Sequence, residues 1–165
     1  MKTIRLNQDR IAIVDYDDFE KIKHLTWTSR KSGNKYYAAH QKYLYRVNGR
    51  QISKCTLMHR LILNAPTGVQ VDHINGDALD NRKENLRLCT PSQNQHNRKA
   101  QVNNKSGFKG VCKPSGRNRY RATIYLHNKP IRLGCFDCPI KAARAYNAAA
   151  IKYHGEFAKL NEIPA

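Results

Sequence analysis

The chain has 165 residues, of which 40% are hydrophobic, and this size suits one or two small domains. Its formal net charge of +18 exceeds what solubility requires and indicates a polyanionic partner. No apolar run approaches the ~18 residues that a membrane-spanning helix needs. No apolar segment follows the charged N-terminus either, so we expect neither a membrane protein nor a secreted one.

The first part of the chain mixes strand and helix signals. A β-branched run over 10–16 predicts a strand, and apolar residues at helical spacing predict a helix over 15–25. The segment 26–43 then predicts two strands around a turn at Ser32-Gly33-Asn34. We expect a mixture of small sheets and short helices here.

A second hairpin is predicted within 42–58, because Asn48-Gly49 is a strong signal for a type I′ turn. The apolar segment 58–64 predicts a helical turn packed under the polar motif that follows. We expect the tyrosines of this region to be packing residues of the sheet: Tyr36, Tyr37, Tyr43 and Tyr45.

The segment VDHINGDALDNRKENLRLCTPSQNQHNR, which begins at Val71, is crowded with polar side chains. It predicts a strand over 70–74, a loop over 75–84 and a second strand over 85–90. A helix should follow over 91–100, because Pro91 suits a first helical position.

The pattern changes after a polar linker at 101–106. Short apolar runs separated by turn residues predict strands within 108–113, 119–126 and 129–136. The alanine-rich segment 139–155 predicts a helix opened by proline and stopped by glycine. Three strands and one packed helix make a small, complete unit.

The polar motif offers the groups that phosphodiester cleavage requires. His73 can take a proton from water, because the unperturbed pKa of histidine lies near neutrality. Asp72 and Asn94 can give oxygen ligands to a hard cation. A site with so small a number of protein ligands suits magnesium, which keeps waters and binds phosphate oxygens of the substrate. Because successive strand residues face opposite ways, Asp72 and His73 must lie at a strand end or a bend.

These residues resemble the HNH nucleases of the homing-endonuclease type found in phages and introns. The resemblance implies a ββα-metal fold, with His73 as the general base and Asp72 and Asn94 holding one divalent metal, Mg²⁺ or alternatively Mn²⁺. It also implies that Asn85 is the central asparagine, which holds the loop so that His73 is aimed correctly.

Several residues of the motif have alternative interpretations. Asn97 lies one turn after Asn94 and is a second candidate for the metal ligand. Asn81 and Arg82 are expected to brace the loop, with Arg82 also a candidate phosphate contact. His96 is expected to contact phosphate or lie on the surface, and His59 to pack or bind backbone.

Alternation along 119–126 predicts an apolar face of Tyr120, Ala122, Ile124 and Leu126 that packs on the helix. The opposite face should be basic and open. Together with SGFKGVCK and the following helix, this pattern resembles the DNA-binding domain of plant ethylene-response factors (Apetala-two type). The resemblance and the basic composition predict contacts to DNA from Arg82, Arg87, Arg98, Lys109, Lys113, Arg119, Arg121, Thr123, Tyr125 and Arg132.

The predicted fold class is therefore α+β. An HNH nuclease domain spans 1–100, with its ββα-metal motif at about 69–99, and a small three-stranded antiparallel sheet packed on one helix spans 107–165. The helix cap of that second domain is expected at Asp137. The five cysteines contain only one C-x-x-C pair, at Cys135 and Cys138, so no structural zinc is expected.

The predicted function is metal-dependent cleavage of double-stranded DNA, as a nick. We expect a monomer or weak dimer in the cytoplasm of a bacterial or phage-infected cell, with no membrane partner and no small-molecule substrate. The main alternative is a non-catalytic transcription regulator that uses the same sheet. A nuclease acting on RNA or on structured DNA is a second alternative.

Overall fold

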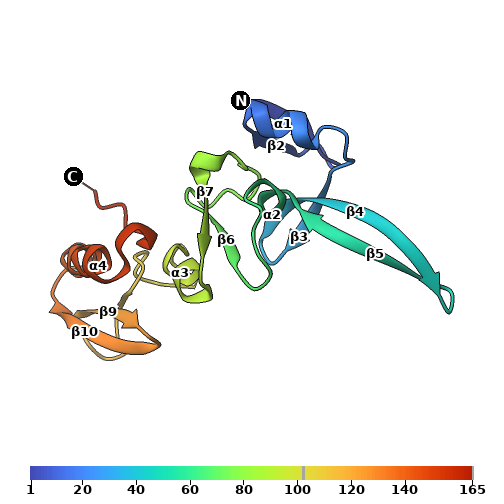
Figure 1. Ribbon diagram of the computed structural model, residues 1–165. Helices are drawn as coiled ribbons and strands as arrows, with labels where there is room; N and C mark the ends of the chain where they lie inside the picture. Colours follow the sequence, from blue (N-terminus) through green and yellow to red (C-terminus); the bar gives the residue numbers. More distant parts are fainter. Residues whose placement is uncertain (102, 165) are drawn as a thin grey trace. The chain divides into compact units, whose positions relative to one another are not determined.

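The computed structural model describes residues 1–101 and 103–164 (Figure 1). The chain has an α+β fold of small antiparallel sheets and short helices, and it divides into two compact units, Met1–Thr90 and Pro91–Ala165. The predicted helix over 91–100 falls in the second unit. In the described part of the chain, no helix is both long enough and apolar enough to cross a membrane.

The first unit opens with a short antiparallel hairpin and a helix. Strand β1 (Lys2–Arg5) pairs with β2 (Ile11–Val14), and α1 follows at Tyr16–Ile22. The sequence predicted β2 and α1. Strand β1 was not predicted, because four residues are too few to establish a period of two.

Strands β3 (Thr28–Ser32), β4 (Lys35–Val47) and β5 (Arg50–Leu57) form an antiparallel sheet in that order. The β4–β5 turn has φ of 47° at Asn48 and 76° at Gly49. Positive φ at both central residues is the property of a type I′ turn, so the predicted hairpin is confirmed.

The long β4–β5 hairpin does not bury all of its tyrosines. Tyr43 and Tyr45 are 54% and 55% exposed, so the prediction that they pack in the sheet is wrong. Tyr36 and Tyr37, nearer the start of β4, are half-buried. The reason is that the sheet has a packed face only where the strands lie against the rest of the unit.

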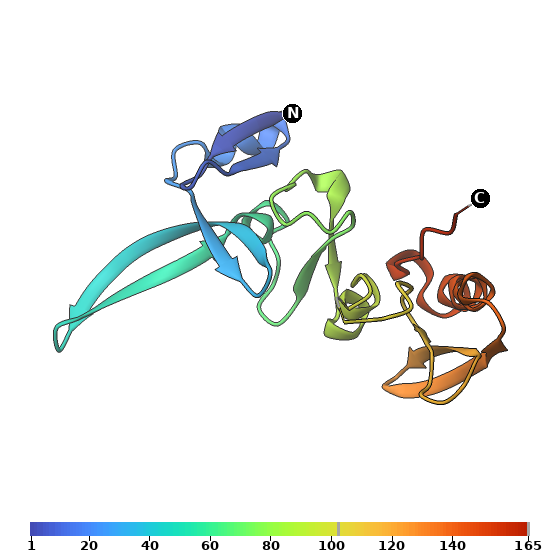
Figure 2. The same ribbon diagram turned by 180° about the vertical axis from the view of Figure 1, so that it is seen from behind.

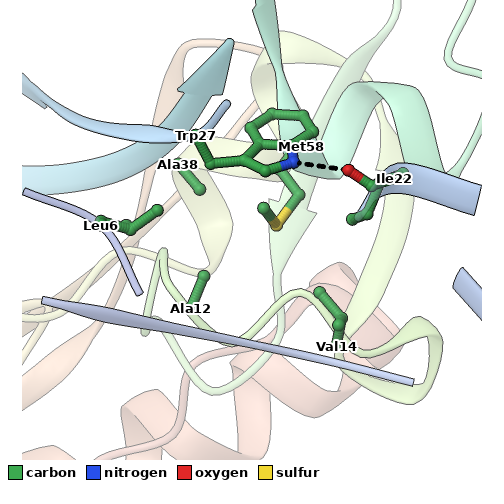
Figure 3. Close-up of a cluster of buried hydrophobic side chains, with 7 residues drawn as sticks. All are labelled: Leu6, Ala12, Val14, Ile22, Trp27, Ala38 and Met58. Carbon is green, nitrogen blue, oxygen red and sulfur yellow. Dashed lines mark hydrogen bonds between the residues drawn. The ribbon is translucent and has the colours of Figure 1, made fainter. Parts of the chain in front are cut away.

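The core of the first unit brings together side chains from distant segments of the chain. Trp27 is buried, and its Nε1 donates to the backbone oxygen of Ile22 at 3.0 Å (Figure 3). This bond satisfies the polar atom of a large buried ring. The cluster comprises Leu6, Ala12, Val14, Ile22, Trp27, Ala38 and Met58.

The polar motif lies on short elements at the end of this unit. Helix α2 (Met58–Ile62) precedes strand β6 (Gln70–His73). After a loop, the 3₁₀ helix η1 (Lys83–Asn85) leads directly into β7 (Leu86–Cys89). Strands β6 and β7 are antiparallel neighbours, as predicted, with Asp72 opposite Arg87.

The second unit contains a three-stranded antiparallel sheet with β9 at its centre, and its one long helix packs on that sheet. Its first helix is shorter than predicted. The elements are α3 (Pro91–His96), β8 (Val111–Cys112), β9 (Tyr120–Leu126), β10 (Lys129–Phe136), α4 (Pro139–His154) and η2 (Gly155–Phe157).

The core of the second unit is made of small side chains from α4 against the sheet. Ala122 and Ile124 of β9 are fully buried and Tyr120 packs against this core, so the predicted apolar face is confirmed at these three positions. A β-bulge between Arg132 and Gly134 interrupts the alternation of β10, and Leu133 packs on the core. The helix packs on this face through Ala142, Ala143, Tyr146, Ala149 and Ala150.

The start of α4 differs from the prediction. Cys138 occupies the N-cap position and no side chain caps the helix there. Asp137 instead forms an ion pair with Lys141 at 3.1 Å, so its predicted role as the cap is wrong.

Candidate active site

Asp72 and His73 end strand β6, and both are buried, with 6% and 4% of their surface exposed. Alternation along the strand directs the two side chains to opposite faces. The carboxylate of Asp72 accepts two bonds from Arg87, from Nε at 3.0 Å and from Nη2 at 2.7 Å. This cross-strand pair fixes the position of the carboxylate.

The imidazole of His73 lies in an aromatic cluster. Its ring centroid is 5.1 Å from that of His59 on α2, nearly perpendicular to it, and 6.1 Å from that of Tyr37 on β4. His59 and Tyr37 are themselves 5.5 Å apart. No local pattern predicts this cluster, because its three members come from separate elements.

Burial lowers the pKa of His73 below its usual value, and the charge of Lys35 acts in the same direction. The side chain of Asn81 and the charges of Asp72 and Asp77 oppose the shift without cancelling it. The imidazole is therefore neutral near pH 7, which is the form that can accept a proton.

Asn85 joins both ends of the loop between β6 and η1. Its Oδ1 accepts from the backbone N–H of Asn75 at 2.9 Å, and its Nδ2 donates to the backbone oxygen of Asp80 at 2.8 Å. Its own backbone oxygen accepts from Ile74 at 2.9 Å. The bonds to Ile74 and Asn75 hold the chain directly after His73, and therefore limit the movement of that residue.

Asp80 accepts hydrogen bonds from residues on both sides of it in the same loop, a role that the sequence did not predict. It is 3% exposed and accepts two bonds from Arg82, at 2.8 Å each, and one from Nδ2 of Asn75 at 2.9 Å. The Arg82 guanidinium holds the pKa of Asp80 below its usual value. Arg82 also pairs with Glu84, so its side chain braces the loop.

The N-terminal hairpin supports the loop from outside. Ile13 of β2 bonds to both sides of it, through Leu79 at 2.9 Å and Asn81 at 2.7 Å. Lys83 then joins the loop to the first helix region, because its ammonium lies 2.9 Å from the buried carboxylate of Asp18. The N-terminal segment therefore helps to fix the loop beside His73.

The remaining predicted ligand, Asn94, lies on α3 in the second unit, where it is half-buried. Asn97 follows directly after that helix. Among the described residues, no group of three or more His, Cys, Asp or Glu side chains could hold a metal ion. A carboxylate and amide oxygens are hard donors that fit magnesium or manganese and do not fit a zinc site built from thiolates.

Strands β9 and β10 of the second unit carry four of the ten predicted DNA contacts, Arg121, Thr123, Tyr125 and Arg132. Thr123 of β9 lies opposite Arg132 of β10, and Tyr125 is 59% exposed. Arg121 is half-buried, and its Nη2 lies 3.6 Å from the sulfur of Cys112. Arg132 is exposed, as are Arg98 after α3, Lys113 after β8 and Arg119 before β9.

Lys109 differs from the other predicted contacts because its ammonium is used inside the unit. Its Nζ donates to the backbone oxygen of His96, and burial lowers its pKa to about 8. His96 stacks on His154 with ring centroids 3.6 Å apart and planes 7° apart. His96 thus joins α3 to α4, and it is not simply a surface residue.

Comparison with known proteins identifies the segment that contains these residues. Residues 57–96 match the HNH endonuclease family. The chain is 30% identical over 154 residues to an uncharacterized HNH endonuclease of Acanthamoeba polyphaga mimivirus, across 92% of this chain and 75% of the viral protein. It is 33% identical over 94 residues to Protein 3.8 of Escherichia phage T7, across 57% of this chain and 77% of the phage protein.

The matched segment runs from the end of β5 through α3 and contains Asp72, His73, Asn85 and Asn94. Three of them, Asp72, His73 and Asn85, lie in the first unit and combine a buried histidine with a buried carboxylate and a buried amide. The chain belongs to the HNH endonuclease family.

Proposed function

We propose that the protein is a metal-dependent HNH endonuclease of the homing type that hydrolyses a phosphodiester bond in duplex DNA and leaves a nick. One observation carries this proposal. His73 is buried next to Asp72 at the end of β6, and Asn85 holds the loop that follows it.

His73 is the general base in this proposal and takes a proton from the attacking water. Its lowered pKa supports that role, because the neutral ring is the dominant form at neutral pH. His59 and Tyr37 pack around the imidazole and keep its orientation. Asn85 acts through the loop and is a positioning residue.

Asp72 and Asn94 are the proposed ligands of one divalent cation, Mg²⁺ or alternatively Mn²⁺. When bound, such a cation would stabilise negative charge on the phosphate and on the departing 3′ oxygen. Asp72 is a hard oxygen donor whose position Arg87 fixes. The expected products carry a 5′-phosphate and a 3′-hydroxyl.

The sheet of the second unit is proposed to grip the DNA, in the manner of the ethylene-response-factor domain that its sequence resembles. Support comes from the exposed, basic face that contains Arg119, Tyr125 and Arg132. One site per chain favours a nick by a monomer or weak dimer. The proposed place of action is the cytoplasm of a bacterial or phage-infected cell.

Supercoiled plasmid incubated with the purified protein tests this function. We expect conversion to nicked circles with Mg²⁺ and none with EDTA. A DNA ligase should reseal the nicked product, because its ends carry a 5′-phosphate and a 3′-hydroxyl. DNA binding without any cleavage under either condition would contradict the proposal and favour the non-catalytic regulator. Preferential cleavage of an RNA or hairpin competitor would contradict duplex DNA as the substrate.

A further inference from the structure

The outer half of the β4–β5 hairpin has no core of its own. Every residue from Gln41 to Ile52 is exposed, and the ribbon extends away from the rest of the first unit in both views (Figures 1 and 2). Seven residues of β4, from Gln41 to Val47, span roughly 20 Å at strand spacing. A two-stranded ribbon of this length is marginally stable in water unless something covers it.

A β-bulge divides the exposed side chains of this ribbon between two faces. Tyr43 lies opposite Ser53, and Tyr45 lies opposite Ile52, so the register shifts at Leu44. Ser53 and Ile52 are neighbours on β5 and point to opposite faces. The two tyrosines therefore also lie on opposite faces, although spacing by two predicts that they share one.

The two faces differ in chemistry. One face is polar and carries a single cation at its outer end: Gln41, Tyr43, Arg46, Gln51, Ser53 and Cys55. The other, which we call the cationic face, alternates three cations with exposed apolar side chains: Lys42, Tyr45, Val47, Arg50, Ile52 and Lys54. The cationic face has the composition of a surface that meets phosphates and bases together.

The surroundings strengthen the positive charge of this face. The sequence contains no acidic residue between Glu20 and Asp72, so no carboxylate on β3, β4 or β5 neutralises it. Within the described residues, the cations that form ion pairs in the first unit are Lys21, Lys23, Arg82, Lys83 and Arg87, none of which is on the hairpin.

We propose that the cationic face of the β4–β5 hairpin docks in the major groove of duplex DNA as a second binding surface, separate from the sheet of the second unit. B-form DNA has a major groove wide enough for a two-stranded β-ribbon. Lys42, Arg50 and Lys54 contact phosphates, and Tyr45 contacts the groove floor. This inference rests on the proposed function only in taking DNA as the partner.

A second copy of this chain fits the ribbon less well than DNA does. Edge-to-edge pairing of two such hairpins would place two sets of uncompensated cations side by side, which is unfavourable. A nucleic acid supplies the opposite charge along the whole length of the face. Duplex RNA is a poorer match, because its major groove is too deep and narrow for side chains to read.

Two pairs of matched substitutions test the proposal in the full chain, in a His73→Ala background so that no cleavage interferes. Tyr45→Ser is compared with Tyr43→Ser, and Arg50→Gln with Arg46→Gln. The two residues of each pair are of the same type and are both exposed, but they lie on opposite faces of the hairpin. Binding to a labelled DNA duplex is measured by fluorescence anisotropy across salt concentrations, after circular dichroism has confirmed folding.

We expect Tyr45→Ser and Arg50→Gln each to weaken binding roughly tenfold, which corresponds to ~1.4 kcal/mol. Arg50→Gln should also lower the slope of log K against log salt by about 0.9, for one lost phosphate contact. Tyr43→Ser and Arg46→Gln should change affinity less than twofold. A duplex RNA competitor should displace the DNA poorly.

Equal losses within each pair would overturn the proposal, because they would show charge attraction without a docked face. Unchanged binding in all four variants would overturn it as well. So would loss of self-association on Tyr45→Ser in sedimentation, which would assign the face to a second copy. Because only binding is measured, a face-specific loss stands even if the wild-type protein proves unable to cut DNA.

Discussion

The candidate site of the first unit and the core of the second unit are held together by different means. The first unit positions its candidate site with buried polar groups, since Asp80 and Asn85 bond to neighbouring loop and backbone atoms. The second unit has a core of alanines packed on Ala122 and Ile124, and this core contains no charged side chain. Polar networks fix the direction of a side chain, whereas small apolar side chains allow close packing of a sheet and a helix.

This difference predicts that the units respond to different kinds of substitution. A polar network is damaged by removing a partner, because the atoms left behind are buried without bonds. A close-packed apolar core is damaged by adding atoms. The single tryptophan, Trp27, lies in the core of the first unit, so its fluorescence reports on that unit.

The largest effect on stability is expected for Gly110→Ala in the second unit. An added Cβ would lie 2.1 Å from the Tyr146 ring and 2.8 Å from the backbone oxygen of Thr123, and φ at this position is +73°. Overpacking and the left-handed backbone together should cost about 4 kcal/mol. Hydrogen exchange of α4 amides, followed by mass spectrometry, measures the loss.

Gly116→Ala is the matched control, because φ there is +71° and nothing lies within 4 Å of the added Cβ. It should cost only the backbone contribution of about 1 kcal/mol. Equal protection of α4 in the two variants would show that the packing of Gly110 against Tyr146 is not tight.

Asp80→Ala should reduce the unfolding free energy of the first unit by about 3 kcal/mol, since it removes the acceptor of Asn75 and Arg82 from a buried position. Urea unfolding followed by Trp27 fluorescence provides the measurement. Asp77→Ala is the control, because Asp77 is exposed, although it accepts one bond from Leu79. An unchanged midpoint for Asp80→Ala would show that the hydrogen bonds of Asp80 do not stabilise the first unit.

A smaller effect is expected in the dependence of the unfolding free energy on pH. Burial lowers the pKa of His59 to about 3, and the charges of His73 and Arg60 add to the shift. The unfolded chain therefore binds the proton first as pH falls below about 6.5. The contribution of neutral His59 to the unfolding free energy is fully present above that pH. It declines toward pH 3, by at most about 1.4 kcal/mol per pH unit.

His59→Phe keeps an aromatic ring against His73 and removes this titration. The slope of unfolding free energy against pH, measured by Trp27 fluorescence between pH 7 and pH 5, should be shallower in the variant. A slope as steep as that of the wild type would show that His59 is not held neutral.

Much of the fold followed from local patterns. Asn48-Gly49 identified the β4–β5 turn, and the alternation of β9 identified its buried face. Periodicity could not show that the outer part of β4 has nothing packed on it, nor that a bulge separates Tyr43 from Tyr45. Both depend on the arrangement of the whole unit rather than on neighbouring residues.

The position of the candidate residues followed from a motif where one was present. Spacing and resemblance predicted that Asp72, His73 and Asn85 act together, and the structure places all three around the end of β6. Asp80 was missed because a carboxylate in a loop has no period that distinguishes it from a solvated one. His59 and Tyr37 were not linked to His73, since contacts between α2, β4 and β6 depend on tertiary packing.

The rate of DNA cleavage by His73→Ala in Mg²⁺, at protein concentrations that give the same DNA occupancy as the wild type, tests the central claim most directly. Loss of a general base predicts a rate lower by roughly 10²–10⁴-fold. Cleavage by His73→Ala as fast as by the wild type would contradict the assignment of His73 as the base.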